Sequence, residues 1–231
     1  MKITYIDHSG FFVMTAHAQF LFDYWKGRIP ALNPELPLYV LVSHVHSDHY
    51  NPAVLELKKT HPDTWYLLSD DIPAVPSDRT LLLSPGRYEN AGGLKLDVLK
   101  STDEGVAYAV ECGDCSIYHA GDLHWWTWPG EETEEEFNDM TARFQSEINK
   151  IRGRHFDAAF LPLDPRQEDR YAWGFDYAAR AVDADCLIPM HQWEKYNTTG
   201  RLLKDPVSAP YRDKIWYITK RGETKELKQK N

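Results

Sequence analysis

The sequence predicts a mixed fold of the α/β or α+β class, and three observations support this prediction. Short β-rich segments separated by turn residues fill the first half of the chain. Helical periodicity occurs in the second half, where it alternates with further strands. The 231 residues, of which 42% are hydrophobic, show no internal boundary and no repeat at a period of about 20 to 50 residues. We therefore expect residues 1–231 to form one compact domain with a polar tail from about residue 222.

Strands dominate the first half of the chain. Aromatic and β-branched side chains fill short runs, and turn residues lie between the runs. One helix is expected at about residues 53–59, where Asn51 supplies the N-cap and Pro52 occupies the first helical position. The predicted strands are residues 3–6, 11–14, 20–23, 38–42, 65–68, 80–83, 94–99, 106–110 and 117–119.

The second half adds longer helices. Residues 131–152 predict a helix because apolar side chains recur at helical spacing and Thr133 with Glu136 matches a capping box. The acidic cluster at the start of this helix suits the positive end of the helix dipole, so it needs no role in binding a metal or a partner. Strands are predicted at residues 158–163, 187–190 and 214–219, and a further helix at residues 171–182.

Cys112 and Cys115 have the spacing of a zinc knuckle or a redox pair. The sequence favours a β-hairpin instead, because Gly113 and Asp114 lie between two strand-like runs. No second pair of this kind completes a four-cysteine zinc site. The odd total of 3 cysteines also does not suggest a disulfide scaffold.

The net charge and the lengths of the apolar runs argue against nucleic-acid and membrane partners. The net charge of −9 argues against binding nucleic acid through its phosphates. The first residues predict a strand rather than a secretory leader, and no apolar run approaches the roughly 18 residues of a membrane-spanning helix. We therefore expect a cytoplasmic protein that acts on a small molecule and has no nucleic-acid or membrane partner; the sequence leaves its oligomeric state open.

The most informative segment is residues 41–49, in which His44, His46, Asp48 and His49 follow a buried strand directly. Imidazole and carboxylate groups suit Zn, Fe, Mn and Ni. Because side chains alternate along an extended segment, His44 and His46 point the same way and can bind one ion together. Asp48 and His49 lie where the chain must turn, so they can reach a second ion. The alternative is a polar loop that is rich in histidine by chance.

The order His-x-His-x-Asp-His resembles the signature of the metallo-β-lactamase-fold hydrolases. This resemblance implies a four-layer αββα sandwich, in which two mixed sheets pack face to face between outer helices. It also implies two divalent metal ions, Zn or Mn, with Fe as a further possibility. The turn around His8 and the short chain are similar to the ascorbate-6-phosphate lactonase-like branch of this superfamily.

The resemblance also implies the remaining ligands. Asp122, in the segment His119-Ala120-Gly121-Asp122, resembles the aspartate that bridges the two ions. A carboxylate suits this role because its oxygens can bind two cations about 3.5 to 4 Å apart. His191 resembles the last ligand, which would give the second ion Asp48, His49, Asp122 and His191. Taken singly, Asp122 and His191 could equally be an ordinary loop aspartate and a strand-end histidine.

One element departs from the family pattern. A third histidine for the first ion is expected near residues 100–105, and this chain has none there. Asp103 is the best substitute, with Thr102, Glu104 or a water as weaker options. A carboxylate at this place would shift the preference toward oxygen-binding metals such as Mn. The first site could also be weakly occupied or empty.

The implied chemistry is attack by a metal-bound hydroxide on an ester, lactone, amide or phosphodiester. Asp48 would orient this hydroxide and carry a proton to the leaving group. The alternative is a metal-binding protein of the same fold, with a degenerate first site and little hydrolytic activity. The acidic charge counts against a nuclease of the RNA-processing branch.

Residues for substrate binding are suggested by their place in the sequence. His8 is expected to face the substrate or to support the metal ligands. Trp125 and Trp126 follow Asp122 and could line a pocket for an apolar or ring-shaped substrate, or they could pack the long helix against the core. Arg166 could bind a phosphate or carboxylate, or it could form an ion pair with a neighbouring aspartate.

Overall fold

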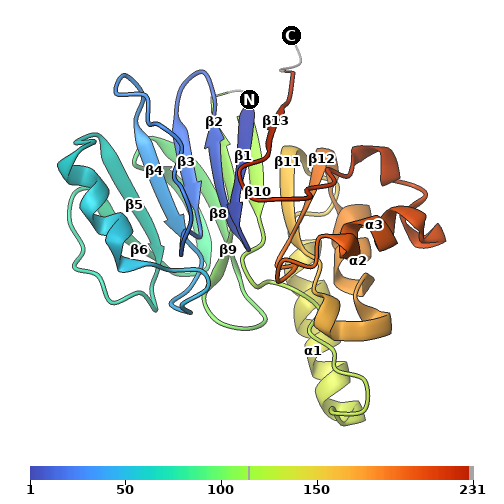
Figure 1. Cartoon of the computed structure of the whole chain (residues 1–231). Coiled ribbons are helices and arrows are strands. Elements are labelled where there is room, and N and C mark those ends of the chain that lie inside the picture. Colours follow the sequence, from blue (N-terminus) through green and yellow to red (C-terminus); the bar gives the residue numbers. More distant parts are fainter. Residues whose placement is uncertain (114, 229–231) are drawn as a thin grey trace.

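The computed structural model describes residues 1–113 and 115–228, and in it two β-sheets lie face to face with helices outside them (Figure 1). This arrangement confirms the predicted αββα sandwich. Among the helices of the described residues, none combines the length and hydrophobicity that a membrane-spanning helix needs.

The first sheet combines an antiparallel part with a parallel part. Its strand order is β13-β1-β2-β3-β4-β5-β6, antiparallel from β13 to β3 and parallel from β3 to β6. The helix predicted from Asn51 and Pro52 is present as a 3₁₀-helix, η1, at Pro52–Lys59. The strands are β1 (Lys2–Asp7), β2 (Gly10–Met14), β3 (Gln19–Phe22), β4 (Leu38–Val42), β5 (Thr64–Ser69), β6 (Thr80–Leu83) and β13 (Thr224–Glu226).

The second sheet has the order β12-β11-β10-β9-β8-β7, parallel from β12 to β10 and antiparallel from β10 to β7. Helices α1, α2 and α3 lie on the side of β11 and β12 (Figure 1). The elements are β7 (Gly86–Ala91), β8 (Leu94–Lys100), β9 (Val106–Cys112), β10 (Cys115–His119), α1 (Glu134–Asn149), β11 (His155–Pro162), η2 (Pro165–Arg170), α2 (Trp173–Ala181), β12 (Asp183–Met190), α3 (Asn197–Lys204), η3 (Pro206–Ser208) and η4 (Arg212–Lys214).

The core between the sheets is aromatic where the strands approach their ends. The rings of Phe11 and Phe160, which come from opposite sheets, lie 4.6 Å apart. Tyr108 is fully buried on β9, and its hydroxyl proton is shared between the carbonyl oxygen of Val42 (2.8 Å) and that of Leu67 (3.2 Å). The Val42 carbonyl is at the end of β4, so this bond ties the start of the histidine-rich segment to the second sheet.

The C-terminal region differs from the prediction. The strand predicted at residues 214–219 is wrong: η4 ends at Lys214, and only Ile215 forms an isolated bridge, to Leu187. Trp216 and Ile218 are buried there. The apolar pattern therefore identified buried residues correctly, but these residues do not form a strand. The last strand, β13, lies inside the predicted polar tail and pairs with β1. Residues 229–231 of that tail lie outside the described residues.

Other expectations are confirmed with adjusted bounds. The helix predicted at residues 131–152 is α1, and both hydrogen bonds of its capping box are present between Thr133 and Glu136. Cys112 and Cys115 face each other across the antiparallel pair β9–β10, as the hairpin prediction requires, while Asp114 lies outside the described residues. The exposed strand β7 and the helix α3 were not predicted, because their side chains do not show a clear apolar pattern.

Gly105 joins the loop that contains Asp103 to β9. A substitution at this glycine tests how tightly the loop is packed. Its φ is +65°, and a Cβ on it would lie 2.0 Å from the carbonyl oxygen of Ser43 and 2.6 Å from Cβ of His44. Gly153 is a matched control, since its φ is +73° and a Cβ would meet nothing within 4 Å. We expect Gly105→Ala to lower the free energy of unfolding by roughly 3 kcal/mol or more and Gly153→Ala by roughly 1 kcal/mol. Urea denaturation measures both, and equal losses would contradict the close packing.

Candidate metal centre

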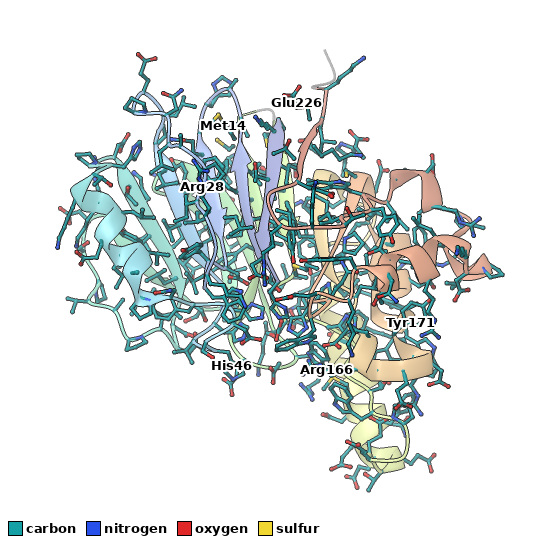
Figure 2. The ribbon with its side chains drawn as sticks, in the orientation of Figure 1. Met14, Arg28, His46, Arg166, Tyr171 and Glu226 are labelled. Carbon is teal, nitrogen blue, oxygen red and sulfur yellow. The ribbon has the colours of Figure 1, made fainter. Side chains whose placement is uncertain are left out.

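The candidate site lies at one edge of the sandwich, where segments far apart in the sequence meet. Figure 2 labels His46 and Arg166 at this edge. His44 and His49 follow β4, Asp122 follows β10, and His191 follows β12. His8 lies in the turn between β1 and β2. Parallel strands end at the same edge of a sheet, so β10 and β12 bring their two ligands together across β11. All five of these side chains are buried.

The first group of candidate ligands is His44, His49 and Asp122, whose ligand atoms lie within 4.8 Å of one another. Nε2 of His49 is 3.2 Å from Oδ1 of Asp122, and Nε2 of His44 is 3.8 Å from Oδ2. The two oxygens of Asp122 therefore face different histidines.

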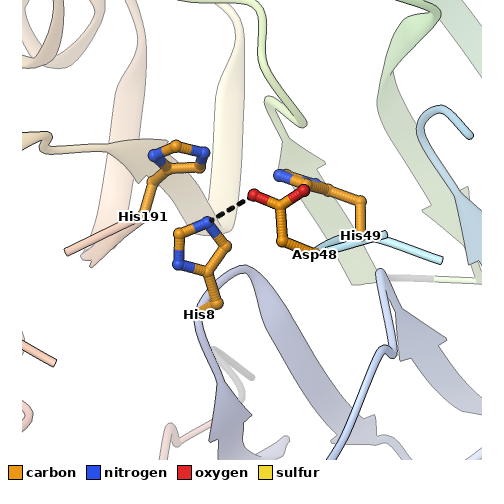
Figure 3. A group of neighbouring side chains, drawn as sticks. All are labelled: His8, Asp48, His49 and His191. Carbon is orange, nitrogen blue, oxygen red and sulfur yellow. Dashed lines mark ion pairs between the residues drawn. The ribbon is translucent and has the colours of Figure 1, made fainter. Parts of the chain in front are cut away.

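The second group is His8, Asp48, His49 and His191 (Figure 3). Nε2 of His8 lies 3.4 Å from Oδ2 of Asp48, and the His8 and His191 rings are 4.1 Å apart. Nε2 of His191 also lies 3.4 Å from Oδ1 of Asp122. His8 was expected to face the substrate or support the ligands, yet its Nε2 lies among the ligand atoms themselves.

The buried polar atoms of these groups fit a cation. Nε2 of His8, His44, His49 and His191 and Oδ1 of Asp122 are buried, and none has a hydrogen-bond partner among the described residues. Leaving a buried polar atom unpaired costs about 1–3 kcal/mol, so five together indicate a missing partner. Imidazole nitrogens and a carboxylate oxygen are the donors that a divalent transition metal binds.

The Nδ1 atoms of the ligand histidines are also held in place. Asp23 and Asp164 hold two of them, and Ser43 holds the third. Nδ1 of His49 is 2.8 Å from Oδ2 of Asp23, and Nδ1 of His191 is 3.0 Å from Oδ2 of Asp164. A carboxylate accepts the Nδ1 proton, which leaves the Nε2 lone pair directed into the centre.

Ser43 orients His44 in the same way. Its hydroxyl donates to Oδ2 of Asp23 at 2.6 Å and lies 2.9 Å from Nδ1 of His44. Because the hydroxyl has a single proton, which goes to Asp23, it accepts from Nδ1 of His44. Sequence reasoning missed the role of Asp23; its only signal was a carboxylate at the end of an apolar strand.

The backbone is strained at several of these residues. His8, Asp23, His191 and Trp193 have φ values of +52°, +41°, +63° and +51°. The left-handed region is unfavourable for residues other than glycine, and such residues concentrate at functional sites.

Charge and burial shift the pKa values of the histidines in opposite directions. Burial lowers the pKa of His8 and that of His44 to about 4, so both are neutral at pH 7. Burial also favours the neutral form of His191, but Asp122 and Asp164 outweigh it and raise its pKa to about 10. Burial opposes the charge of Asp122 as well, but the surrounding histidines hold its pKa well below the ordinary value.

His46 and Asp103 lie at the rim of the site rather than in its buried groups. Nδ1 of His46 is 3.8 Å from Oδ2 of Asp103, and their side chains are 47% and 46% exposed. Burial and the nearby Asp122 raise the pKa of Asp103 above its ordinary value. The structure thus brings the predicted substitute ligand next to His46, at the edge of the cluster.

A cavity of about 440 Å³ opens above the ligands. The structure brings Trp126 and Arg166 to it but not Trp125, whose ring packs against Phe144 at 5.8 Å and Tyr177 at 6.1 Å. The substrate-binding prediction therefore does not apply to Trp125, which packs the long helix as the alternative proposed. The cavity is lined by His46, Asp48, Thr102, Asp103, Asp122, Trp126, Trp128, Met140, Arg166, His191 and Trp193.

Two other histidines have structural contacts. His119 stacks on Phe22, with ring centroids 4.9 Å apart, and its Nε2 lies 3.0 Å from the carbonyl oxygen of Ser9. His61 lies away from the cluster, where Nε2 is 2.9 Å from the carbonyl oxygen of Leu36.

The raised pKa of His191 can be tested in the metal-free protein. We expect Asp164→Asn to lower this pKa from about 10 toward its ordinary value, because burial then opposes the charge with only Asp122 against it. Titration of the imidazole nitrogens by NMR measures the change. Asp176→Asn is the control, since Asp176 also accepts from an arginine, Arg180, but on helix α2. An unchanged pKa in Asp164→Asn would contradict the assigned cause.

Comparison with known proteins agrees with this geometry. The beta-lactamase superfamily domain matches residues 2–137. A UPF0173 metal-dependent hydrolase from Desulforamulus reducens is 25% identical, over 90% of both chains. Two solved structures share the fold: a metallo hydrolase of Ignicoccus hospitalis (TM-score 0.58, 19% identity, 98% of this chain and 99% of that chain) and the metallo-beta-lactamase fold protein YhfI of Bacillus subtilis (TM-score 0.61, 16% identity, 97% and 99%). The chain therefore belongs to the beta-lactamase superfamily and is a metal-dependent hydrolase of the metallo-β-lactamase fold.

Proposed function

We propose that this protein hydrolyses a carbonyl or phosphoryl ester bond at a centre of two divalent ions, Zn or Mn, with Fe as a further possibility. The observation that carries the proposal is the gathering of Nε2 of His8, His44, His49 and His191 around the carboxylates of Asp48 and Asp122. These four nitrogens and Oδ1 of Asp122 are buried and have no hydrogen-bond partner among the described residues. Divalent ions, when bound, lower the pKa of a bound water and polarise the attacked bond.

We assign the ligands in two sets that share Asp122. The first set is His44 and His46, with Asp103 at the rim in place of a third histidine. The second set is Asp48, His49 and His191, and the contact between His8 and Asp48 at 3.4 Å supports adding His8 to it, as a ligand or as the group that holds Asp48.

Asp48 is the proposed acid–base residue. Its side chain is 23% exposed and lines the cavity beside the ligand groups. Partial burial would raise the pKa of Asp48, but the nearby imidazoles of His8 and His49 hold it below the ordinary value. Asp48 is therefore a carboxylate at neutral pH, able to orient the attacking water by accepting its hydrogen bond and to pass a proton to the leaving group.

The exposure of His46 and Asp103 favours one other candidate function. If these two residues fail to hold an ion, the protein is a metal-binding member of the fold with little hydrolytic activity. The single domain over residues 1–231, the cytoplasmic location and the kinship with the lactonase-like branch stay predictions.

Metal content tests the first ligand set. We expect about two ions per chain in the wild type and about one in Asp103→Ala, because the loss of the carboxylate leaves two histidines and a shared aspartate. Plasma mass spectrometry after loading with Zn or Mn measures this content. Glu104→Ala is the control, since Glu104 is the neighbouring exposed carboxylate and should leave two ions. One ion in every protein would remove the first site from the proposal.

Activity tests the hydrolase itself. We expect the loaded wild type to hydrolyse at least one of an ester, a lactone, an amide and a phosphodiester, and His191→Ala to lower kcat/KM by about 100-fold or more, because a ligand is lost. His155→Ala, at the start of β11, is a control that should keep full activity. A wild type that holds two ions but hydrolyses none of the four would favour the metal-binding alternative.

A further inference from the structure

The cavity above the candidate ligands has one aromatic side. Trp126 and Trp128 are stacked with ring centroids 6.0 Å apart and planes at 10°, and Met140 of α1 lies on the same cavity. Trp126 is anchored to the site, because its Nε1 donates to the carbonyl oxygen of Asp122 at 3.0 Å. Indole rings and a thioether offer dispersion and hydrophobic contact, and they offer no charge to a ligand.

Trp193 also lines this cavity. Its ring lies 4.5 Å from that of His8 and 5.6 Å from that of His191, so it borders the ligand groups directly. It is 39% exposed, which is unusual for so large an apolar side chain next to a buried cluster. Its Nε1 donates to Oδ2 of Asp164 at 3.3 Å, which fixes the orientation of the ring. The indole is therefore held in place, with part of its surface exposed at the cavity.

Arg166 is the one arginine on the cavity wall among the described residues, and its charge is already paired. Its Nε and Nη2 donate to Oδ2 of Asp164 at 2.9 and 2.5 Å. Its Cζ lies 4.8 Å from the ring centre of Trp193 and 5.7 Å from that of Trp128. The Asp164 carboxylate therefore offsets the charge of the guanidinium and weakens its attraction for a second anion, although the side chain is 45% exposed and keeps N–H groups that Asp164 does not bind.

Apart from the histidines, the remaining charged side chains of the wall are the carboxylates assigned above as ligands. Asp48, Asp103 and Asp122 line the cavity together with Arg166, and no lysine from residues 1–113 or 115–228 does so. A phosphate or carboxylate placed beside the tryptophans, away from the ions, would find only the Arg166 cation, which Asp164 already pairs, and a charge without a partner of its own is costly to desolvate.

We propose that the substrate is an uncharged ester, lactone or amide that carries a flat apolar ring beside the scissile bond, and that this ring lies between Trp193 and the Trp126–Trp128 pair. The proposal rests on the hydrolytic function proposed above and narrows its substrate class. It disfavours phosphorylated lactones and phosphodiesters, which the sequence left open.

The test compares two esters that differ only in the ring, methyl phenylacetate and methyl acetate, with the metal-loaded protein. We expect Trp193→Ala to lower kcat/KM for methyl phenylacetate about tenfold and that for methyl acetate less than twofold. Trp173→Ala is the matched control, because Trp173 is 41% exposed and lies 5.0 Å from the Cζ of an arginine, Arg170, but away from the cavity. It should change neither value.

The Trp193→Phe variant distinguishes the contribution of the aromatic ring from that of the hydrogen bond to Asp164. This variant keeps a flat apolar ring and loses the indole N–H, so we expect it to restore most of the preference for methyl phenylacetate. If Trp193→Ala slows both esters equally, or if Trp193→Phe behaves like Trp193→Ala, the residue only positions the site and the proposal is overturned.

Binding of two uncleaved probes distinguishes this proposal from the hydrolytic one. Calorimetry with the metal-loaded protein compares acetophenone, which is neutral and has no leaving group, with benzenesulfonate, which carries one negative charge and binds metals weakly. We expect tighter binding of acetophenone, weakened about tenfold by Trp193→Ala and unchanged by Trp173→Ala. This result without any ester hydrolysis would keep the ring site and reject the hydrolase, whereas tighter binding of benzenesulfonate would overturn the ring site.

Discussion

The carboxylate of Asp122 is the interaction on which this structure depends. It is buried, and its two oxygens face His44, His49 and His191 at 3.2 to 3.8 Å. A buried carboxylate is costly unless positive charge or hydrogen bonds surround it. In the metal-free chain the raised pKa of His191 supplies part of that positive charge. The strand ends, the left-handed residues and the supporting carboxylates all serve to keep these groups close together.

The fold and part of the site could be predicted because their signals are local. His44, His46, Asp48 and His49 lie within one short segment, and alternation along a strand determines which of them point the same way. Asp122 became recognisable through the family resemblance, as did His191. Strands with an apolar pattern were also found, whereas residues 215–219 were misassigned because burial alone does not reveal hydrogen bonding.

The carboxylates that hold the ligand histidines could not be predicted, because only the tertiary structure places them next to those histidines. Asp23 is distant in sequence from His49 and reaches it because β3 and β4 are parallel neighbours. Asp164 was considered as a partner of Arg166, yet it also holds Nδ1 of His191. Trp125 and Trp126 are adjacent, and their side chains point to different sides of the chain. No pattern in the sequence separates the ring that lines the cavity from the ring that packs α1.

The ligands come from nearly the whole length of the chain, since His8 lies in the first hairpin and His191 follows β12. During synthesis, the segment around His44 emerges long before its partners, and alone it could hold an ion only loosely. The complete centre forms only when both sheets have assembled and β12 has joined β11. Only the fully folded chain would therefore bind metal tightly. A truncated or half-folded chain would lose its metal to competing chelators in the cell.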